Sequence, residues 1–256
     1  MFFETQPGRL IDPVGARTWS GREIIGRVHG RVRHFQHEGL RKGERVFVHY
    51  SNKLEFFLDL LALWHCGASL VPIDSRLTVF EIENLARAVK PRLLLVDSAA
   101  DASLLSGIPG LDLTVVNTAN WDAADAILSG SLSNFRCQAD LDGEALILFT
   151  SGSTGVPKGV VHTHRSLRAR WISLRDNLGV AAFRRTLCLL PTHFGHGLIC
   201  NSLYPWLAGQ DLIIGPPFSI DLLMGLGRLI DEYKITFLSS VPSMWQLILK
   251  ASKPPA

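Results

Sequence analysis

Short apolar runs alternate along the chain with longer segments whose apolar residues recur at helical spacing. In the first half this pattern predicts strands over residues 45–50, 69–73, 93–96 and 113–116, and helices over 53–65 and 79–89. Further on it predicts strands over 145–149, 160–163, 186–190, 211–214 and 235–238, and helices over 166–178, 198–207, 220–233 and 241–249. Continuous apolar runs are typical of parallel strands buried on both faces. The pattern therefore predicts an α/β protein with largely parallel β-sheets flanked by helices.

One long segment interrupts this alternation. Residues 117–142 are polar, rich in serine and aspartate, and periodic nowhere. We interpret them as a connection, or as an irregular helix, between two units. The sequence thus predicts two stacked α/β subdomains, residues 1–140 and residues 141–256.

The composition is that of a globular protein. Of the 256 residues, 47% are hydrophobic, which allows a sizeable core, and 19% are charged. The formal net charge is +3, from 26 basic and 23 acidic residues. This balance argues against a disordered chain and against a nucleic-acid-binding protein. We interpret the densest basic stretches, residues 27–45 and 165–175, as solvated helix faces.

The cysteines and the N-terminus bear on the cellular compartment. No two of the four cysteines form a C-x-x-C pair, which argues against a zinc knuckle or a redox pair. Three of them lie in apolar context and are expected to be reduced core residues, which favours a cytoplasmic setting. The first residues predict no signal peptide. The most apolar stretch, residues 56–73, contains Asp59, His65 and Gly67 and is interpreted as a buried helix and a strand, not as a membrane span.

Residues with chemical potential concentrate in one segment. Residues 150–159 read TSGSTGVPKG and directly follow a predicted strand. Glycine lets the backbone bend sharply and bring N–H groups near an anion, hydroxyls add donors, and lysine supplies a full positive charge. The segment is therefore predicted to be a phosphate-binding loop between two strands, at the strand end where α/β folds usually bind ligands. The alternative is a flexible serine- and glycine-rich hairpin loop.

Two familiar nucleotide-binding motifs are absent from the sequence. The P-loop requires glycine directly before lysine and then serine or threonine. Here Pro157 precedes Lys158 and Gly159 follows it, and no Gly-Lys dipeptide occurs in the chain. Residues 195–197 and 225–227 each read Gly-x-Gly but lack the third glycine of a dinucleotide fingerprint.

The segment instead resembles the phosphate-binding signature of the adenylate-forming superfamily, which includes acyl- and aryl-CoA ligases, luciferase-like enzymes and adenylation domains of peptide synthetases. Residues 150–160 carry this resemblance most specifically. Residues 19–24, 63–74 and 241–243 are similar, in the same order, to the superfamily's (T/S)-Y/W-x-E-L, L-x-x-G-A-x-x-V-P-I-D and V-P-(S/T) elements. The resemblance extends from about residue 19 to the end and implies the N-terminal domain of such an enzyme.

The resemblance implies a reaction and its participants. Superfamily members join a carboxylate to the α-phosphate of ATP, release pyrophosphate, and pass the acyl group to coenzyme A, a carrier-protein thiol or another acceptor. The implied role of Lys158 is catalytic, because a fixed positive charge stabilises the charge that develops on the phosphates. Mg²⁺ is implied as the companion of ATP, without a dedicated metal cluster in this sequence. The implied phosphate-binding residues are Thr150, Ser151, Gly152, Ser153, Thr154, Gly155 and Lys158.

A second segment, residues 191–197, resembles the superfamily's sequence beside the acyl pocket. The implied pocket residues are His193, Phe194, Gly195 and His196. Many acyl-CoA ligases carry P-x-F-H-x-x-G there, and the two histidines of this chain are offset from that pattern. Amino-acid-activating domains carry Phe-Asp, whose carboxylate holds the substrate ammonium. This chain lacks that aspartate, which favours a carboxylic acid without an α-amino group.

Simpler interpretations apply to several histidines. The alternative for His193 and His196 is capping of backbone groups in a strand-to-helix turn. A His-x-x-His metal site has no evident third ligand. We interpret His162, His164 and Asp74 as turn or capping residues rather than as catalytic ones.

The resemblance also implies elements that these 256 residues do not contain. They are a Tyr-Gly-x-Thr-Glu-like element beside the adenine, a ribose-binding aspartate, a hinge, and a small C-terminal domain with a catalytic lysine. We therefore expect the chain alone to be inactive, and to expose an apolar face that favours self-association. The competing hypothesis is a phosphate- or partner-binding module without catalysis, which would bind ATP without pyrophosphate exchange.

Overall fold

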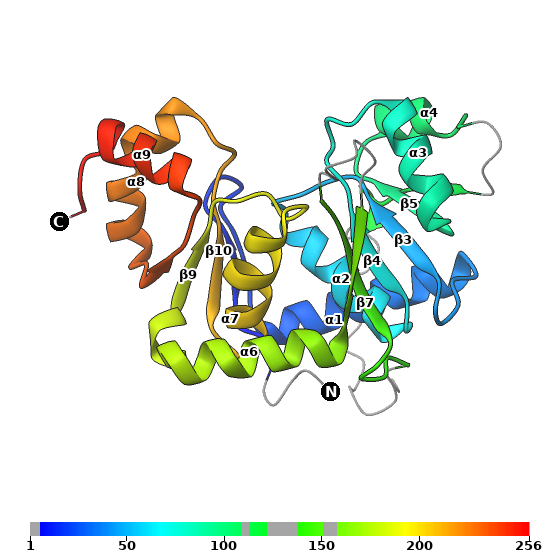
Figure 1. Ribbon diagram of the computed structural model, residues 1–256, viewed down its shortest axis with the longest axis horizontal. Coiled ribbons are helices and arrows are strands. Elements are labelled where there is room, and N and C mark those ends of the chain that lie inside the picture. Colours follow the sequence, from blue (N-terminus) through cyan, green and yellow to red (C-terminus); the bar gives the residue numbers. More distant parts are fainter. Residues whose placement is uncertain (1–5, 109–112, 122–137, 151–157, 256) are drawn as a thin grey trace. The chain divides into compact units, whose positions relative to one another are not determined.

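The computed structural model describes residues 6–108, 113–121, 138–150 and 158–255, which form two compact units (Figure 1). The six-stranded unit comprises Ile24–Ser51 and Glu55–Leu167, and the five-stranded unit comprises Met1–Glu23, Asn52–Leu54 and Arg168–Ala256. The units interleave along the chain, which differs from the consecutive subdomains 1–140 and 141–256 that the sequence predicted. The difference arises because strands that follow residue 140 complete the sheet of strands that precede it.

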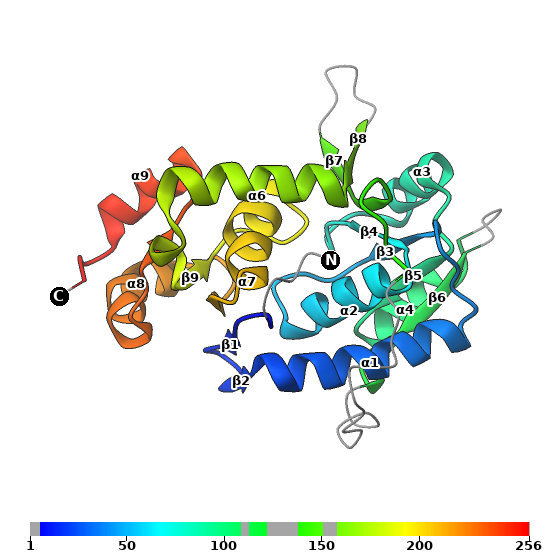
Figure 2. The same cartoon turned by 90° about the horizontal axis from the view of Figure 1, so that it is seen from below.

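The six-stranded sheet has the strand order β6-β5-β3-β4-β7-β8. Its strands are β3 (Arg45–Val48), β4 (Ser69–Pro72), β5 (Leu93–Val96), β6 (Thr114–Asn117), β7 (Glu144–Thr150) and β8 (Lys158–Thr163). Neighbours pair in parallel except β7 and β8, which are antiparallel and lie side by side in Figure 2. The chain passes from β3 to β4 on one side and then to β5 on the other. Ligands of open α/β sheets bind at the carboxyl ends of strands near such a reversal.

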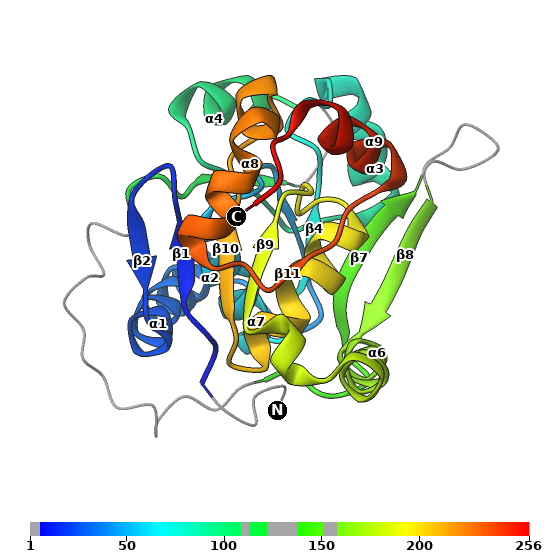
Figure 3. The same cartoon turned by 90° about the vertical axis from the view of Figure 1, so that its left-hand side faces the viewer.

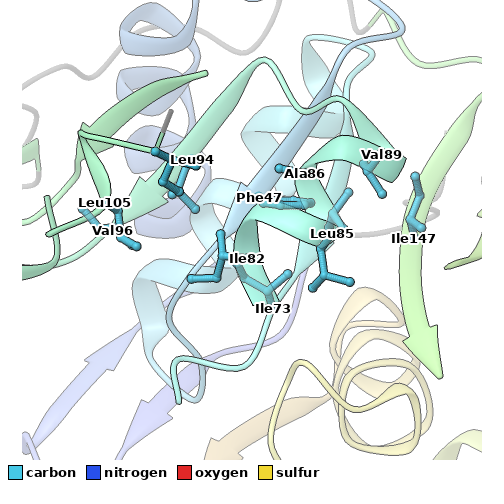
Figure 4. Packing of buried hydrophobic residues seen from close by; sticks show 12 residues of the cluster. Phe47, Ile73, Ile82, Leu85, Ala86, Val89, Leu94, Val96, Leu105 and Ile147 are labelled. Carbon is cyan, nitrogen blue, oxygen red and sulfur yellow. The ribbon is translucent and has the colours of Figure 1, made fainter. Parts of the chain in front are cut away.

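Helices α3 (Val79–Val89) and α4 (Ala99–Leu105) cover one face of this sheet. Figure 4 shows apolar side chains of both helices beside alternate residues of the strands, among them Phe47, Ile82, Leu94 and Leu105, which are all buried. Right-handed crossover connections place α2 (Leu54–His65) on the opposite face. The sheet is thus covered on both sides, as its continuous apolar strands predicted.

Short polar and glycine signals set the ends of several helices. Before α1 (Gly21–His37), the backbone N–H of Ser20 donates to the Glu23 carboxylate at 2.7 Å, and the Ser20 hydroxyl accepts the Glu23 N–H. Thr78 and Glu81 form the same capping box at α3. Directly after α2, Gly67 has φ +73°, a left-handed conformation that glycine adopts without strain. Ser20 and Gly67 lie in segments that the resemblance had singled out, whereas Thr78 does not.

A buried ion pair joins α1 and α2. The Arg31 guanidinium donates to the Asp59 carboxylate at 3.0 Å, and neither side chain is more than 1% exposed. Tyr50 donates its hydroxyl to the same carboxylate, and burial together with the charge of Asp59 raises the pKa of Tyr50. The Arg31 guanidinium also lies 5.2 Å from the centre of the Trp121 ring. The prediction of a solvated face over residues 27–45 is therefore wrong at Arg31, which points into the interior.

The five-stranded sheet has the order β11-β9-β10-β1-β2, and Figure 3 shows these strands in sequence across the sheet. Its strands are β1 (Leu10–Asp12), β2 (Arg17–Trp19), β9 (Arg185–Cys188), β10 (Asp211–Ile214) and β11 (Phe237–Leu238). The pairs are parallel except β1–β2, which is antiparallel. Helix α6 (His164–Leu178) begins in the six-stranded unit and continues into this one from Arg168. The other helical segments of the five-stranded unit are the 3₁₀ turn η2 (Val180–Phe183), the π-helix η3 (His196–Leu203), α7 (Tyr204–Leu207), α8 (Ile220–Tyr233) and α9 (Pro242–Ala251). The predicted α/β class with largely parallel sheets is confirmed.

The cysteines of the described residues are buried or partly buried. Cys66 and Cys188 are buried and Cys200 is partly buried, none of these three forms a disulfide, and Cys137 lies outside the described residues. Burial raises the pKa of the Cys188 thiol to about 11, which keeps it protonated and unreactive. Within the described ranges, every helix is too short or too polar to span a lipid bilayer.

Candidate functional site

The segment predicted to bind phosphate connects two paired strands. β7 ends at Thr150 and β8 begins at Lys158, and these two exposed residues lie opposite each other in the antiparallel register. The Thr150 hydroxyl lies 3.4 Å from the carbonyl oxygen of Lys158. The structure therefore brings a hydroxyl side chain and a lysine to the same end of the hairpin. The remaining predicted phosphate-binding residues lie outside the described residues: Ser151, Gly152, Ser153, Thr154 and Gly155.

The start of β7 is fixed by contacts with its neighbours in the six-stranded unit. The Trp64 indole N–H donates to the carbonyl of Ala145 at 2.8 Å, and the Ser69 hydroxyl donates to the carbonyl of Glu144 at 3.0 Å. Two nitrogens of the Arg45 guanidinium lie 2.8 and 2.7 Å from the Glu144 carboxylate. The hydrogen bond from Arg45 lowers the pKa of Glu144. The strand therefore delivers Thr150 from a well-anchored position in the sheet.

The histidines that follow the segment are packing and turn residues. His162 lies in β8 opposite Leu146 and is buried. His164 is the first residue of α6, and its ring centre lies 4.9 Å from that of Trp64 in an edge-on contact. Burial lowers the pKa of His164 to about 4, so its ring is neutral at neutral pH. Its backbone N–H donates to the carbonyl of Gly143 at 3.3 Å, in keeping with the predicted turn role.

The carboxyl edge of the six-stranded sheet carries a buried histidine that the sequence did not single out. His49 directly follows β3 and is 6% exposed. In the part of the chain that the structure describes, neither of its ring nitrogens has a hydrogen-bond partner. Burial lowers the pKa of His49, and the carboxylates of Asp101, Asp97 and Asp74 oppose that effect. Asp74 is a turn residue, as predicted, because it accepts the backbone N–H of Arg76 at 3.0 Å.

The predicted acyl-pocket residues lie after β9 in the five-stranded unit, and the last of them, His196, is the first residue of η3. The backbone N–H of Phe194 donates to the carbonyl of Pro191 at 3.0 Å and forms a turn. The Phe194 side chain is 46% exposed, whereas His193, Gly195 and His196 are partly buried. The structure therefore brings these four residues together in one turn that leads into the π-helix.

Two other residues hold this turn in place. The Asn52 side chain donates to the carbonyl of Leu190 at 3.2 Å and accepts the backbone N–H of Thr192 at 2.9 Å. At Gly197 an added Cβ would lie 2.6 Å from the carbonyl oxygen of Pro191, closer than real Cβ atoms approach. Only glycine fits there, so the turn and the first residues of η3 can pack closely.

His196 belongs to a hydrogen-bonded group that sequence reasoning missed. Its Nε2 lies 2.8 Å from the Ser239 hydroxyl, and the Asn201 side-chain amide donates to the Ser239 carbonyl at 2.6 Å. Asn201 is fully buried, and among the described residues its Oδ1 has no hydrogen-bond partner. Buried acceptors are normally satisfied, and π-helices are frequent at functional sites. An asparagine in an otherwise apolar helical segment was the available signal.

His193 and His196 are not part of a metal centre within the described part of the chain. Over those residues, no group of three or more histidine, cysteine, aspartate or glutamate side chains is arranged to hold a metal ion. The arrangement instead offers a polar lining: a histidine with a hydroxyl partner, and a buried amide oxygen.

Comparison with known proteins gives a family and its relatives. The family model described as AMP-binding enzyme matches residues 4–256. The beta-alanyl-bioamine nonribosomal peptide synthetase ebony of Drosophila melanogaster is 30% identical over 196 residues, which are 74% of this chain and 21% of ebony. A 3-[(3aS,4S,7aS)-7a-methyl-1,5-dioxo-octahydro-1H-inden-4-yl]propanoyl:CoA ligase of Mycobacterium tuberculosis is 28% identical over 247 residues, which are 91% of this chain and 48% of the ligase.

The fold has a counterpart among solved structures. ATP-bound MatB from Rhodopseudomonas palustris matches with a TM-score of 0.80 at 22% identity, over 97% of this chain and 49% of the MatB chain. At this identity the likeness concerns the fold. The chain spans about half the length of MatB and of the CoA ligase, and about a fifth of ebony.

Proposed function

The chain belongs to the AMP-binding enzyme family, and we propose that it takes part in the ATP-dependent activation of a carboxylic acid to an acyl-adenylate. The observation that carries this proposal is the hairpin in which Thr150 and Lys158 flank the glycine- and hydroxyl-rich segment. In an open α/β sheet, the carboxyl end of a parallel strand such as β7 is the usual place for a ligand. The chain shares its fold with MatB, whose structure contains ATP. This likeness in fold agrees with the proposal that ATP is a substrate.

In the proposed reaction Lys158 binds the β- and γ-phosphates of ATP. It begins β8 and is exposed, so its ammonium group is accessible to a ligand. A positive charge held at that point stabilises the negative charge that develops as pyrophosphate leaves. The Thr150 hydroxyl is a further donor at the same end of the hairpin. Mg²⁺ would accompany ATP through its phosphates, and over the described residues no group of three or more histidine, cysteine, aspartate or glutamate side chains is arranged to hold a metal ion.

The acid in this proposal is a fatty, aromatic or other simple carboxylic acid rather than an α-amino acid. The turn of residues 193–196 and the Ser239 and Asn201 groups supply polar contacts, while residues 191–210 contain no aspartate or glutamate. A buried ammonium group needs a fixed anionic partner, because an unpaired buried charge is costly. The segment offers hydrogen bonds but no such partner.

The acyl acceptor in this proposal is coenzyme A. The likeness to a CoA ligase over 91% of the chain supports that choice. A carrier-protein thiol is the second candidate, because ebony, a nonribosomal peptide synthetase, is also similar. We further propose a cytoplasmic setting, with which the buried, reduced cysteines Cys66 and Cys188 agree. Incubation of the full-length protein with ATP, acid and either acceptor, followed by detection of the thioester, distinguishes the two acceptors.

The central test is ATP–pyrophosphate exchange in the full-length protein. Lys158→Ala is expected to slow exchange by about 10²-fold or more, since one charge-stabilising donor is lost. The matched control is Lys250→Ala, which removes an exposed lysine at the end of α9 and should leave the rate unchanged. When the same assay is run with a panel of acids, simple carboxylic acids should support exchange and α-amino acids should support little. Equal rates for both lysine variants, or ATP binding without any exchange, would contradict the proposal.

A further inference from the structure

A basic pocket lies at the amino edge of the six-stranded sheet. It is a cavity of about 730 Å³ where β3 and β5 begin and α3 ends. In Figure 4, Ala86 and Val89 mark this end of α3. Thr150 stands at the opposite edge, because β7 runs parallel to β4 and ends there. The pocket is therefore separate from the hairpin assigned to ATP.

The lining of the pocket is strongly positive. Four cationic side chains line it and one anionic side chain does, namely Arg45, Arg87, Lys90, Arg92 and Glu44. The whole chain has a formal net charge of only +3, so this edge concentrates positive charge. Positive charge gathered in a concave surface raises the local concentration of anions.

Two of these cations are already neutralised by carboxylates outside the pocket lining. Arg45 forms a two-nitrogen ion pair with Glu144, and Arg87 lies 2.6 Å from a carboxylate oxygen of Glu83. These pairs hold the pocket wall in shape and leave little charge for a ligand. Recognition must therefore come from the other two cations.

Lys90 and Arg92 are the two cations that lack a carboxylate partner among the described residues. Arg92 donates to the Thr114 hydroxyl at 2.9 Å, which fixes its guanidinium without neutralising it. Lys90 is exposed directly after α3, at φ +53°. Attraction to the negative end of a helix accounts for a cation at Lys90. It does not account for Arg92, which precedes β5.

At the negative end of α3, one carbonyl is bound by a side chain of the pocket wall. The Arg45 guanidinium donates to the carbonyl of Val89 at 3.1 Å. The backbone N–H of Lys90 donates to the carbonyl of Ala86 at 2.7 Å. The pocket thus presents two cations that lack a carboxylate partner, beside a helix end at which Arg45 already binds one carbonyl.

We propose that this pocket is a binding site for a small phosphate monoester, whose phosphate is bound by Lys90 and Arg92. A phosphate monoester carries about −1.5 to −2 charge at neutral pH and would pair with these two cations, while the Glu44 carboxylate of the lining opposes it. Arginine and lysine are the usual partners of phosphate oxygens. The cavity has room for an organic group beside the phosphate, since small-molecule sites typically measure roughly 300–1,000 Å³.

The test is calorimetric titration of the purified chain with phenyl phosphate. We expect saturable binding, with a dissociation constant raised at least tenfold in Lys90→Gln/Arg92→Gln. The control Lys250→Gln/Lys253→Gln removes the same net charge from exposed positions of the five-stranded unit and should bind as the unmodified chain does. Lys158→Ala should also bind normally, which separates this site from the proposed ATP hairpin.

Lys90→Glu is a second variant, which distinguishes a loss of binding from a loss of folding. Its side chain is exposed and makes no hydrogen bond or ion pair in the described residues, so the fold should tolerate the change while phosphate binding is lost. Equal affinity in the pocket variants and the Lys250→Gln/Lys253→Gln control would overturn the proposal. So would loss of all binding in Lys158→Ala alone, because the titration would then report only the hairpin.

Discussion

Asp59 is a fully buried carboxylate that faces the Arg31 guanidinium and the Tyr50 hydroxyl. We predict that Asp59→Ala lowers the free energy of unfolding by about 3–5 kcal/mol, because the buried charge of Arg31 would lose the carboxylate that faces it. Urea unfolding followed by circular dichroism measures this change. The expected loss of stability comes from the buried charge of Arg31 rather than from the lost contact alone.

Removal of both charges distinguishes these two causes. Arg31→Met combined with Asp59→Leu keeps comparable volume and leaves no buried charge behind. Such replacements of buried ion pairs are often neutral or stabilising. The double variant is therefore expected to be close to the unmodified chain in stability. A loss as large as that of Asp59→Ala would show that packing or hydrogen bonding, not charge, dominates at this site.

His164 makes stability depend on pH. Its pKa is about 4 in the folded chain, because of burial, and about 6.5 in the unfolded chain. Between these values the unfolded chain binds a proton that the folded chain does not, so stability falls as pH falls from about 6.5 to about 4. The shift corresponds to at most about 3 kcal/mol. His164→Gln should make the unfolding midpoint less dependent on pH over this range. His37→Gln, which removes an exposed histidine at the end of α1, should leave that dependence unchanged.

At the scale of elements, the capping box of α3 is a local signal with a measurable effect. The Thr78 hydroxyl accepts the N–H of Glu81, and the Glu81 carboxylate accepts the N–H of Thr78 at 2.8 Å. Thr78→Ala is expected to lower the free energy of unfolding by about 1 kcal/mol, since one orphan N–H of the helix loses its partner. Thr78→Ser keeps the acceptor and should stay within a few tenths of a kcal/mol. Amide hydrogen exchange over residues 79–82 would locate the effect, and equal exchange in both variants would contradict it.

Elements with a strong hydrophobic pattern could be predicted from the sequence. The helix predicted over residues 79–89 and the strand over 93–96 have the observed bounds, because their apolar positions are regular and their ends carry turn residues. The strands β1 and β2 were missed, since each is only three residues long and β1 depends on pairing with the distant strand β10. No local pattern contains that pairing.

The candidate site was predictable to the extent that it is a local motif. The hairpin around Thr150 and Lys158 follows from glycine and hydroxyl residues between two apolar runs. The His196–Ser239 contact could not be predicted, because the two residues are 43 positions apart and meet through tertiary packing. The burial of Arg31 was missed for a similar reason. A basic stretch at helical spacing does not reveal which of its residues faces a carboxylate on another helix.

At the scale of the whole molecule, each unit has its own core, and the five-stranded unit also exposes apolar surface. On α8 and α9, Ile220 is 72% exposed, Met224 is 63% exposed and Leu249 is 82% exposed. Other residues of the same helices, such as Leu226 and Ile248, are buried in the core. Exposed apolar side chains of this size favour association. The proposal that the chain self-associates rests on this surface.

We finally predict that the 256-residue chain, purified alone, does not form an acyl-adenylate at a useful rate. It supplies Lys158 and the polar turn that we propose for acid binding, but it spans about half the length of the CoA ligase and MatB. The adenine, ribose and second-lysine elements implied by the resemblance are not among its residues. Contacts to phosphates alone leave ATP poorly oriented, and orientation supplies a large part of an enzyme's rate. An open site also admits water, which weakens each electrostatic contact. The measurement is AMP release with ATP, Mg²⁺, coenzyme A and the acid panel. Turnover at roughly 1 s⁻¹ or faster, ordinary for an enzyme, would show that these residues suffice for the reaction.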